Sequence, residues 1–251
     1  MRHWWNAALN LLYPASCFGC GRPTDRPGFC QPCQATIALP QPPLCTICGA
    51  PFHTSAGADH PCGRCLSRTP HFGRARACAI YDARDTGTSN AATNNAGADP
   101  LKAVLQRYKY NRDVGLAPAL GALLAHRAPL SAAAYDVIIP VPLHISRLRW
   151  RGFNQAQLLA VHFAGPCTID PHSLARVRPT RPQVDLHESE RRRNVAGAFR
   201  VTRPARIDGR RILLVDDVFT TGATVDECSD ALLRAGAHSV DVLVLARAVQ
   251  H

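Results

Sequence analysis

The sequence predicts an α/β fold in which helices flank a parallel sheet, preceded by a small cysteine-rich module. Two observations predict this fold. Residues 212–215 are continuously apolar, residues 240–245 are apolar except for Asp241, and one helix-length segment separates the two stretches. In addition, four C-x-x-C pairs lie within the first 65 residues. Continuous apolar stretches are typical of parallel strands that are covered on both faces. The chain length of 251 residues suits one or two domains, and we expect the module at 1–75 and the α/β domain at 76–251.

The cysteine pairs predict metal binding. Two C-x-x-C turns can supply the four ligands of a closed tetrahedral zinc site. Disulfides need an oxidising compartment, and a redox site would explain one pair rather than four. We therefore predict two structural zinc ions, without which the module would not fold. The predicted ligands are eight of the eleven cysteines: Cys17, Cys20, Cys30, Cys33, Cys45, Cys48, Cys62 and Cys65.

The order in which the cysteine pairs combine is a separate question. Nine residues separate the first two pairs and thirteen separate the last two, so joining neighbouring pairs closes the shortest loops. A cross-braced arrangement, which joins the first pair to the third, is the alternative.

The net charge of +11 predicts anionic partners such as phosphates, nucleotides or nucleic acid. Eight thiolates and two Zn²⁺ ions would lower it to +7. The cations are 27 arginines and only two lysines, Lys102 and Lys109. A lysine in so arginine-rich a chain either marks a site that needs a compact ammonium, which we consider for Lys109, or is a surface charge without a role.

No apolar stretch reaches the length of about 18 residues that a membrane-spanning helix requires. Residues 1–17 are interrupted by Asn6 and Asn10 and end without a cleavage site, so we expect a short amphipathic packing helix rather than a signal peptide. These features favour a cytoplasmic protein with no membrane insertion.

The middle of the chain begins with residues 86–100, which are rich in Gly, Asn and Thr and which we expect to be a flexible insertion. Apolar residues at helical spacing then predict a helix through 101–108 and a second through 116–128. Residues 137–139 predict a buried strand that breaks into a loop at Pro140 and Pro142. We expect the three arginines at 147, 149 and 151 on that loop, with a helix beginning near Asn154.

Residues 176–199 are strongly basic and contain Pro179 and Pro182. Their poor periodicity predicts an extended or mobile segment that serves as a lid or as a surface for polyanions. The candidate nucleic-acid contacts are Arg176, Arg178, Arg181, Arg191, Arg192 and Arg193.

Asp216 and Asp217 follow the apolar residues 212–215, which places them at the carboxyl edge of the sheet, where open α/β sheets bind ligands. The turn that follows, Thr220–Thr224, is small and hydroxyl-rich and leads into a helix whose N-terminal amides suit a phosphate. Phosphate contacts beside two carboxylates suit a phosphorylated ribose, bound directly or through Mg²⁺. A P-loop NTPase needs a lysine that follows a glycine, and neither lysine does, so the sequence argues against this class. No G-x-G-x-x-G is present either, which disfavours a Rossmann dinucleotide-binding site.

The stretch VDDVFTTGAT resembles the phosphoribosyl pyrophosphate (PRPP) motif of type I phosphoribosyltransferases. The chain as a whole resembles the ComF family, because the cysteine pairs are followed in order by YKYNRD, DVIIPVPLHISRLRWRGFNQAQLLA, PTRPQVDLHESERRRNVAGAF and this motif. The segment 86–100 departs from the family pattern by lengthening the chain before Lys109.

The resemblance implies roles for particular residues. Asp216 and Asp217 would bind the ribose hydroxyls, and the turn would hold the 5-phosphate. Lys109 and Arg151 would act with the two acids in catalysis, near the pyrophosphate and its Mg²⁺. The implied PRPP contacts are Asp216, Asp217, Val218, Thr220, Thr221, Gly222, Ala223, Thr224, Pro142 and Arg147.

ComF-like proteins are associated with DNA uptake in natural transformation, so the resemblance implies single-stranded DNA and other uptake proteins as partners. The alternative is an active phosphoribosyltransferase of nucleotide or base metabolism, unrelated to DNA, with an acceptor that the sequence does not specify. Such an enzyme would displace pyrophosphate from C1 of the ribose.

Overall fold

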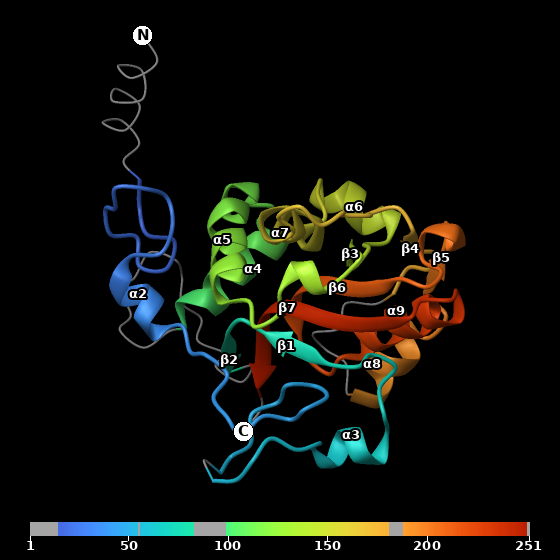
Figure 1. Cartoon of the computed structure of the whole chain (residues 1–251). Helices are drawn as coiled ribbons and strands as arrows, with labels where there is room; N and C mark the ends of the chain where they lie inside the picture. The colour runs from blue at the N-terminus through green and yellow to red at the C-terminus, as the bar shows by residue number, and fades with distance from the viewer. Residues whose placement is uncertain (1–14, 55, 83–98, 181–187, 250–251) are drawn as a thin grey trace.

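The computed structural model describes residues 15–54, 56–82, 99–180 and 188–249 (Figure 1). The predicted N-terminal helix and most of the predicted insertion at 86–100 lie outside these residues. No described helix is long and apolar enough to cross a membrane.

A parallel sheet forms the centre of the molecule, as predicted. It contains β1 (Ala75–Ala77), β2 (Ile80–Asp82), β3 (Val137–Pro140), β6 (Arg211–Phe219) and β7 (Ser239–Val249). The strand order is β1-β7-β6-β3, and β2 also pairs with β7. All of these pairs are parallel, with Ile212 of β6 opposite Val137 on one side and Val240 on the other.

Both faces of the sheet are covered, which explains the continuously apolar strands. Ile212 and Leu214 of β6 belong to one core cluster, which includes residues of α9 (Ala223–Arg234). Leu213 and Val215 point to the opposite face and pack with residues of α4 (Pro100–Tyr110), α5 (Ala117–Arg127) and α7 (Gln155–Phe163). Side chains alternate across a strand, so β6 buries residues on both faces. Short 3₁₀ turns lie at Val114–Leu116, Ala132–Ala134 and Pro204–Arg206.

The residues after β3 differ from the prediction. The expected arginine-bearing loop contains a helix, α6 (Ile145–Arg151). His144 caps it by accepting a hydrogen bond from the Ser146 N–H, and Gly152 ends it with a left-handed φ of 86°. Seven residues are fewer than two full turns, so their apolar spacing could not show this helix.

The arginine-rich segment is also more ordered than predicted. Its described residues include α8 (Glu188–Val195) and, at its ends, the antiparallel strands β4 (Leu174–Arg176) and β5 (Phe199–Val201). Helix α8 packs against α9. Its charged sequence has no apolar periodicity, so tertiary contacts rather than an apolar stripe hold this helix. Arg181 and the rest of 181–187 lie outside the described residues.

Two small cysteine-containing units precede the sheet. The first unit contains Cys17, Cys20, Cys30 and Cys33 with helix α2 (Gln31–Thr36), and the second contains Cys45, Cys48, Cys62 and Cys65 with helix α3 (Gly63–Ser67). The first unit contacts α4 and α5, where Arg107 donates to the Phe18 carbonyl and Arg127 to the Gln34 and Ile37 carbonyls. The second unit contacts the sheet, where Arg76 of β1 donates to the Thr46 carbonyl. Figure 1 shows α2 beside α4 and α5.

Candidate functional site: a ligand cleft and two cysteine groups

The acid pair lies within a strand rather than after one. Strand β6 continues to Phe219, four residues beyond the predicted end at Val215. Strand β3 ends at Pro140, opposite Val215, so from Asp216 onward β6 pairs only with β7. The end of β3 thus leaves one edge of β6 open at Asp216 and Asp217. The neighbouring strand extends β6 here, which residue preference could not show, because Asp is depleted in strands.

Asp217 forms an ion pair with Lys109, the lysine that the composition singled out. The Lys109 Nζ lies 3.0 Å from Asp217 Oδ1, and Asp217 is 7% exposed. Burial opposes the charge of Lys109, but the negative charge of Asp217 beside it outweighs this effect and holds the lysine pKa above its ordinary value. The Lys109 ammonium is therefore charged at neutral pH.

Asp216 lies in a different electrostatic environment. Its Oδ1 accepts a hydrogen bond of 2.8 Å from the Asp217 N–H. Burial raises the pKa of Asp216 to about 7, and the adjacent charge of Asp217 adds to the effect while Lys109 opposes it. Asp216 therefore changes its protonation near neutral pH, so a ligand or a metal ion can alter its charge.

The turn after β6 has the features of an anion site. Gly222 is the N-cap residue of α9, with a φ of 81°, and provides no side-chain cap. A neighbouring side chain makes only a long contact to the first turn, in which Thr221 Oγ1 accepts from the Ala223 N–H at 3.4 Å. A Cβ at Gly222 would lie 2.5 Å from Phe219 Cζ, so only glycine fits. The uncapped N–H groups of the first turn and the helix dipole favour a negative ligand.

Several cations that face the same space each have a nitrogen without a hydrogen-bond partner among the described residues. The Nε atoms of Arg151 and Arg176 and the Nζ of Lys102 are buried without a hydrogen-bond partner among the described residues. Burial lowers the pKa of Arg176 to about 10, with Arg147 adding repulsion, and burial also lowers the pKa of Arg151. Buried polar groups without partners are costly, and an anionic ligand would satisfy them.

These groups line one cleft of about 1420 Å³. Both lysines of the chain lie in it, seven residues apart on α4. The predicted site residues that line it are Lys109, Pro142, Arg147, Arg151, Arg176, Arg191, Asp216, Asp217, Val218, Thr220, Thr221 and Thr224. Gly222 and Ala223 shape the turn beneath. The opposite wall includes residues of the second cysteine unit.

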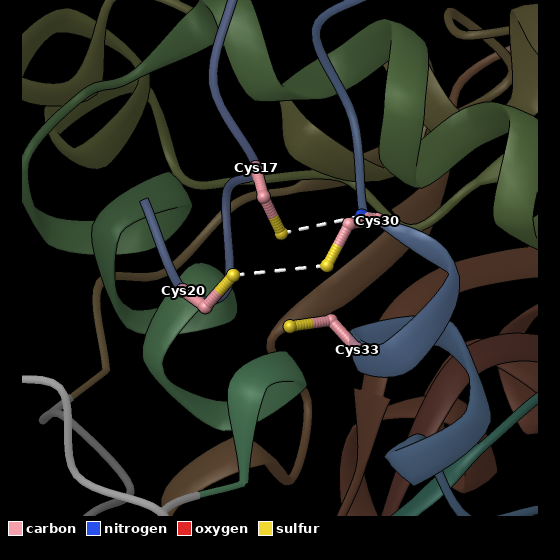
Figure 2. A group of neighbouring side chains, drawn as sticks. All are labelled: Cys17, Cys20, Cys30 and Cys33. Carbon is pink, nitrogen blue, oxygen red and sulfur yellow. Dashed lines mark hydrogen bonds between the residues drawn. The ribbon is translucent and has the colours of Figure 1, made fainter. Parts of the chain in front are cut away.

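The eight paired cysteines form two groups of four, each built from neighbouring pairs. Within each group the possible ligand atoms lie within 4.8 Å of one another. Figure 2 shows the first group, in which the sulfurs of Cys20 and Cys30 are 3.7 Å apart. In the second group the sulfurs of Cys48 and Cys62 are 3.8 Å apart. A tetrahedron with Zn–S bonds of about 2.3 Å has edges of about 3.8 Å, so both groups fit one zinc ion each.

Backbone donors prepare the thiolates. The Cys45 sulfur accepts from the N–H groups of Cys48 and Cys62, at 3.4 and 3.2 Å, and the Cys17 sulfur accepts from the Cys30 N–H at 3.2 Å. Burial raises the pKa of both thiols, but these donors outweigh it and lower the pKa of Cys17 and of Cys45 to about 6. Thiolates are the form that binds zinc.

Comparison with known proteins agrees with both halves of the structure. Residues 8–66 match the double zinc ribbon domain, and residues 136–250 match the phosphoribosyl transferase domain. The DNA utilization protein YhgH of Salmonella typhimurium is 34% identical over 94% of this chain and 99% of its own length. The chain belongs to the ComF family. Competence protein F of Haemophilus influenzae is 31% identical, over 88% of this chain and 91% of its own length.

A further relative of this ComF protein is competence protein ComFC of Streptococcus pneumoniae, which is 29% identical over 81% of this chain and 87% of its own length. The family models agree with the predicted fold class, a phosphoribosyltransferase-like sheet with an N-terminal zinc-binding module. The solved structure of the allosteric regulatory enzyme of purine biosynthesis matches 50% of this chain and 24% of its own chain, at 23% identity and a TM-score of 0.34.

The arginines predicted to contact nucleic acid lie in different surroundings. Arg176 is buried in the cleft, where its guanidinium contacts Thr180 and lies 5.2 Å from the centre of the Phe199 ring. Arg178 donates to the carbonyls of Asn194 and Ala196. Arg191 lines the cleft, and Arg193 is exposed.

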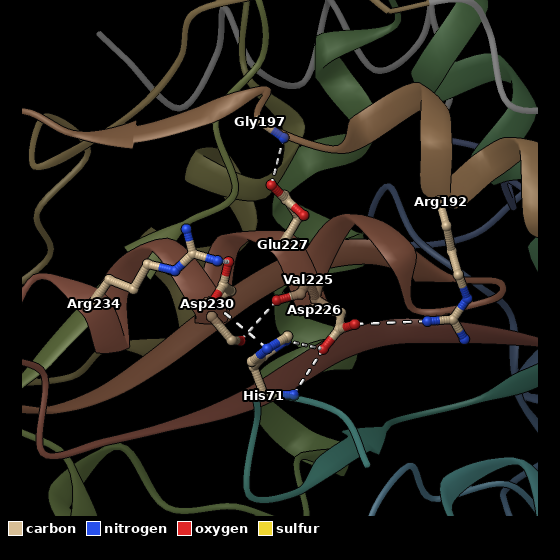
Figure 3. A network of polar contacts seen from close by, with 9 residues as sticks. His71, Arg192, Gly197, Val225, Asp226, Glu227, Asp230 and Arg234 are labelled. Atoms are coloured by element: carbon tan, nitrogen blue, oxygen red, sulfur yellow. Dashed lines mark hydrogen bonds and ion pairs between the residues drawn. The ribbon is translucent and has the colours of Figure 1, made fainter. Parts of the chain in front are cut away.

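Arg192 belongs to a polar network between α8 and α9 (Figure 3). Its guanidinium pairs with Asp226 at 3.6 Å, and Asp226 also accepts from the N–H and the ring of His71. This ion pair ties α8 to α9. The five of these arginines that the structure describes therefore do not form one continuous surface.

Several cleft residues of this ComF protein escaped sequence reasoning. Gln155 is 2% exposed, and its Nε2 has no partner among the described residues. Tyr81 on β2 and Arg247 on β7 also line the cleft, although they are far apart in the sequence. Only Lys102 carried a signal, the scarcity of lysine. The others come together through strand order, which one sequence does not reveal.

Proposed function

We propose that this ComF protein binds PRPP with Mg²⁺ in the cleft and takes part in DNA uptake or processing during natural transformation. The observation that carries the ligand assignment is the acid pair beside an uncapped, glycine-containing helix N-terminus, within one cleft that also holds buried cations. Acids suit ribose hydroxyls, and the helix amides and cations suit phosphates.

Each part of PRPP has a proposed partner. Asp216 and Asp217 would accept hydrogen bonds from the ribose 2- and 3-hydroxyls. The turn Thr220–Thr224 would hold the 5-phosphate through its N–H groups and hydroxyls. The pyrophosphate would contact Lys109, Arg147 and Arg151, of which Arg147 already donates to the Thr180 carbonyl at 3.2 Å.

The donor set in the cleft also fits Mg²⁺. Mg²⁺ prefers carboxylate and phosphate oxygens and retains several waters, so an acid pair facing a pyrophosphate is a suitable environment. The ion would neutralise part of the ligand's charge, which would reduce repulsion with Asp216 and Asp217.

The DNA half of the proposal is supported by the named roles of the relatives, by the net charge of +11, and by the cleft rim. Trp150 is 48% exposed at that rim, and the guanidinium of Arg112 lies 4.9 Å from the centre of its ring. An exposed aromatic ring beside arginines is a surface on which a base of a single strand can stack.

The second candidate is an active phosphoribosyltransferase with an unidentified acceptor. The cleft volume favours it, because about 1420 Å³ exceeds the range of roughly 300–1,000 Å³ that suits one small molecule. Lys109, Arg147 and Arg151 would stabilise the charge of departing pyrophosphate, and catalysis would depend on positioning.

Calorimetry with PRPP and Mg²⁺ tests the ligand assignment. We expect Asp217→Asn to abolish binding, because the variant loses the charge that pairs with Lys109 and accepts the ribose hydroxyls. Asp136→Asn is the control, since Asp136 pairs with Arg211 outside the cleft. Unchanged affinity in Asp217→Asn would refute the assignment. Pyrophosphate release, measured with and without single-stranded DNA, then separates an enzyme from a binding protein.

A further inference from the structure

The second cysteine unit forms part of the ligand cleft. Residues 50–54, with Cys62 and Arg64, line the same cleft as Asp216 and Asp217. Cys45, Cys48 and Cys65 are buried in the core cluster that also contains Phe219 and Ala223. The first cysteine unit instead makes its hydrogen bonds to α4 and α5. The two predicted zinc sites therefore contact different parts of the α/β domain: the second adjoins the ligand cleft, and the first adjoins α4 and α5.

Arg247 joins the second unit to the sheet. It lies on β7, is 5% exposed, and donates to the Cys48 carbonyl at 2.6 Å, with its other terminal nitrogen 3.7 Å from the Cys48 sulfur. No described carboxylate forms an ion pair with it. A buried arginine needs a compensating negative charge. Zn²⁺ held by four thiolates has a net charge of −2, and the second cysteine group would supply that charge.

The Arg247 guanidinium also contacts Phe219, the residue that precedes the turn Thr220–Thr224. It lies 4.5 Å from the centre of the Phe219 ring, and the two residues are paired in the β6–β7 register. Phe219 in turn packs beneath Gly222, where there is no room for a Cβ, and edge-on against Phe72. A continuous set of contacts thus runs from a zinc ligand, Cys48, to the N-cap of α9.

We propose that the second zinc ribbon is a structural part of the ligand site. Arg247 is a positioning residue through which metal binding to the second cysteine group fixes the shape of the turn Thr220–Thr224. Metal in the second cysteine group holds the Cys48 carbonyl in place, Arg247 stays fixed over Phe219, and the turn keeps its shape. Metal in the first group has no such effect. The inference about ligand affinity rests on the proposed function, but the inference about the turn does not.

Hydrogen exchange of the full-length, zinc-loaded protein tests the tie without any ligand. We expect Arg247→Met to speed exchange of the amides in 219–224 about tenfold, as expected when hydrogen bonds from a charged group are lost. Arg76→Met is the matched control, because Arg76 also donates to a carbonyl of the second unit, that of Thr46, but does not contact Phe219.

The outcomes of this comparison are distinct. Faster exchange in Arg247→Met alone supports the proposal. Loss of one zinc from Arg247→Met supports it too, because coupling between two sites is reciprocal. Unchanged exchange in 219–224 overturns it, and equal acceleration in both variants overturns it by showing a general loosening of the second unit.

A second pair of variants tests the difference between the metal sites. Cys62→Ser and Cys30→Ser remove the corresponding ligand from each group, and elemental analysis verifies that each loses one zinc. We expect faster exchange at 219–224 only in Cys62→Ser, and a PRPP–Mg²⁺ affinity at least tenfold lower than in Cys30→Ser. Equal effects in the two variants would overturn the proposal. If the unaltered protein binds no PRPP, the proposed function fails, while the exchange result still decides the tie.

Discussion

The ionisation of Asp216 depends strongly on its environment. Its folded-state pKa of about 7 lies above the ordinary value of 3.8. An acid whose pKa rises on folding binds more protons in the folded state, so its ionisation lowers stability as pH rises from about 4 to about 7. Below that window the group makes no difference, and above it the full penalty applies. A site that holds such a strained carboxylate is suited to a ligand that compensates its charge.

The corresponding prediction concerns Asp216→Asn. We expect this variant to be more stable than the unaltered protein by about 2 kcal/mol at pH 8, with the gain shrinking as pH approaches 4. Urea unfolding at pH 4.5 and pH 8 measures it.

Asp136→Asn serves as the opposite case. The ion pair and hydrogen bonds with Arg211 lower the pKa of Asp136, so its charge stabilises the fold above the ordinary pKa, and its loss should destabilise the protein at pH 8. A destabilised Asp216→Asn at pH 8 would contradict the electrostatic account of the acid pair.

At the scale of elements, the turn between β6 and α9 depends on one glycine. Gly222 needs both a positive φ and the absence of a Cβ. These two requirements can be separated experimentally, because Gly209 has a φ of 66° but has no neighbouring atom within 4 Å of an added Cβ.

We therefore expect Gly222→Ala to cost roughly 2–4 kcal/mol and Gly209→Ala about 1 kcal/mol, since only the first adds a collision with Phe219 to the backbone strain. Thermal unfolding of the two variants measures the difference. Equal costs would show that Phe219 moves freely, and would weaken the case that the turn has a fixed shape.

Helices α6 and α8 each carry residues that we propose as DNA contacts, and the two sets can be tested separately. Replacing Arg191, Arg192 and Arg193 by Ala should lower single-stranded DNA affinity and make its salt dependence shallower, because fewer phosphates are neutralised. Trp150→Ala on α6 should lower affinity with little change in salt dependence, because stacking releases few ions. Fluorescence anisotropy over a salt series measures both. An unchanged affinity and salt slope in the triple variant would remove α8 from the DNA surface.

At the scale of the whole molecule, the two cysteine groups attach the N-terminal module to different parts of the α/β domain. The first unit contacts α4, which carries Lys109, and the second contacts β7 through Arg247. Each unit has few apolar residues of its own, so bound metal would supply much of the free energy that orders it.

We expect two zinc ions per chain by elemental analysis, and loss of the module's order when a strong chelator removes them. Hydrogen exchange of residues 15–67 would then rise more than that of 212–215, which the sheet protects. One zinc or none per chain would refute the pairing of all eight cysteines into two sites.

Sequence alone determined much of this protein. Strands β3, β6 and β7 and helices α4, α5 and α9 follow from apolar spacing, and the two groups of four cysteines follow from their close repeats, because both signals are local. The stretch that resembles the PRPP motif is likewise contiguous. The domain boundary at 75, the lid at 176–199 and the roles of the individual site residues stay predictions.

Only the tertiary structure decided how these parts meet. Strand β3 ends before β6 does, which leaves Asp216 and Asp217 at an open edge of β6. Packing against α9 stabilises α8 as a helix although its sequence has no apolar periodicity. The sequence marked Arg176 only as one of several candidate nucleic-acid contacts and gave Arg247 no role. Strand order buries one in the cleft and the other beneath a cysteine group. Such contacts join residues far apart in the chain, where spacing and composition carry no information about distance.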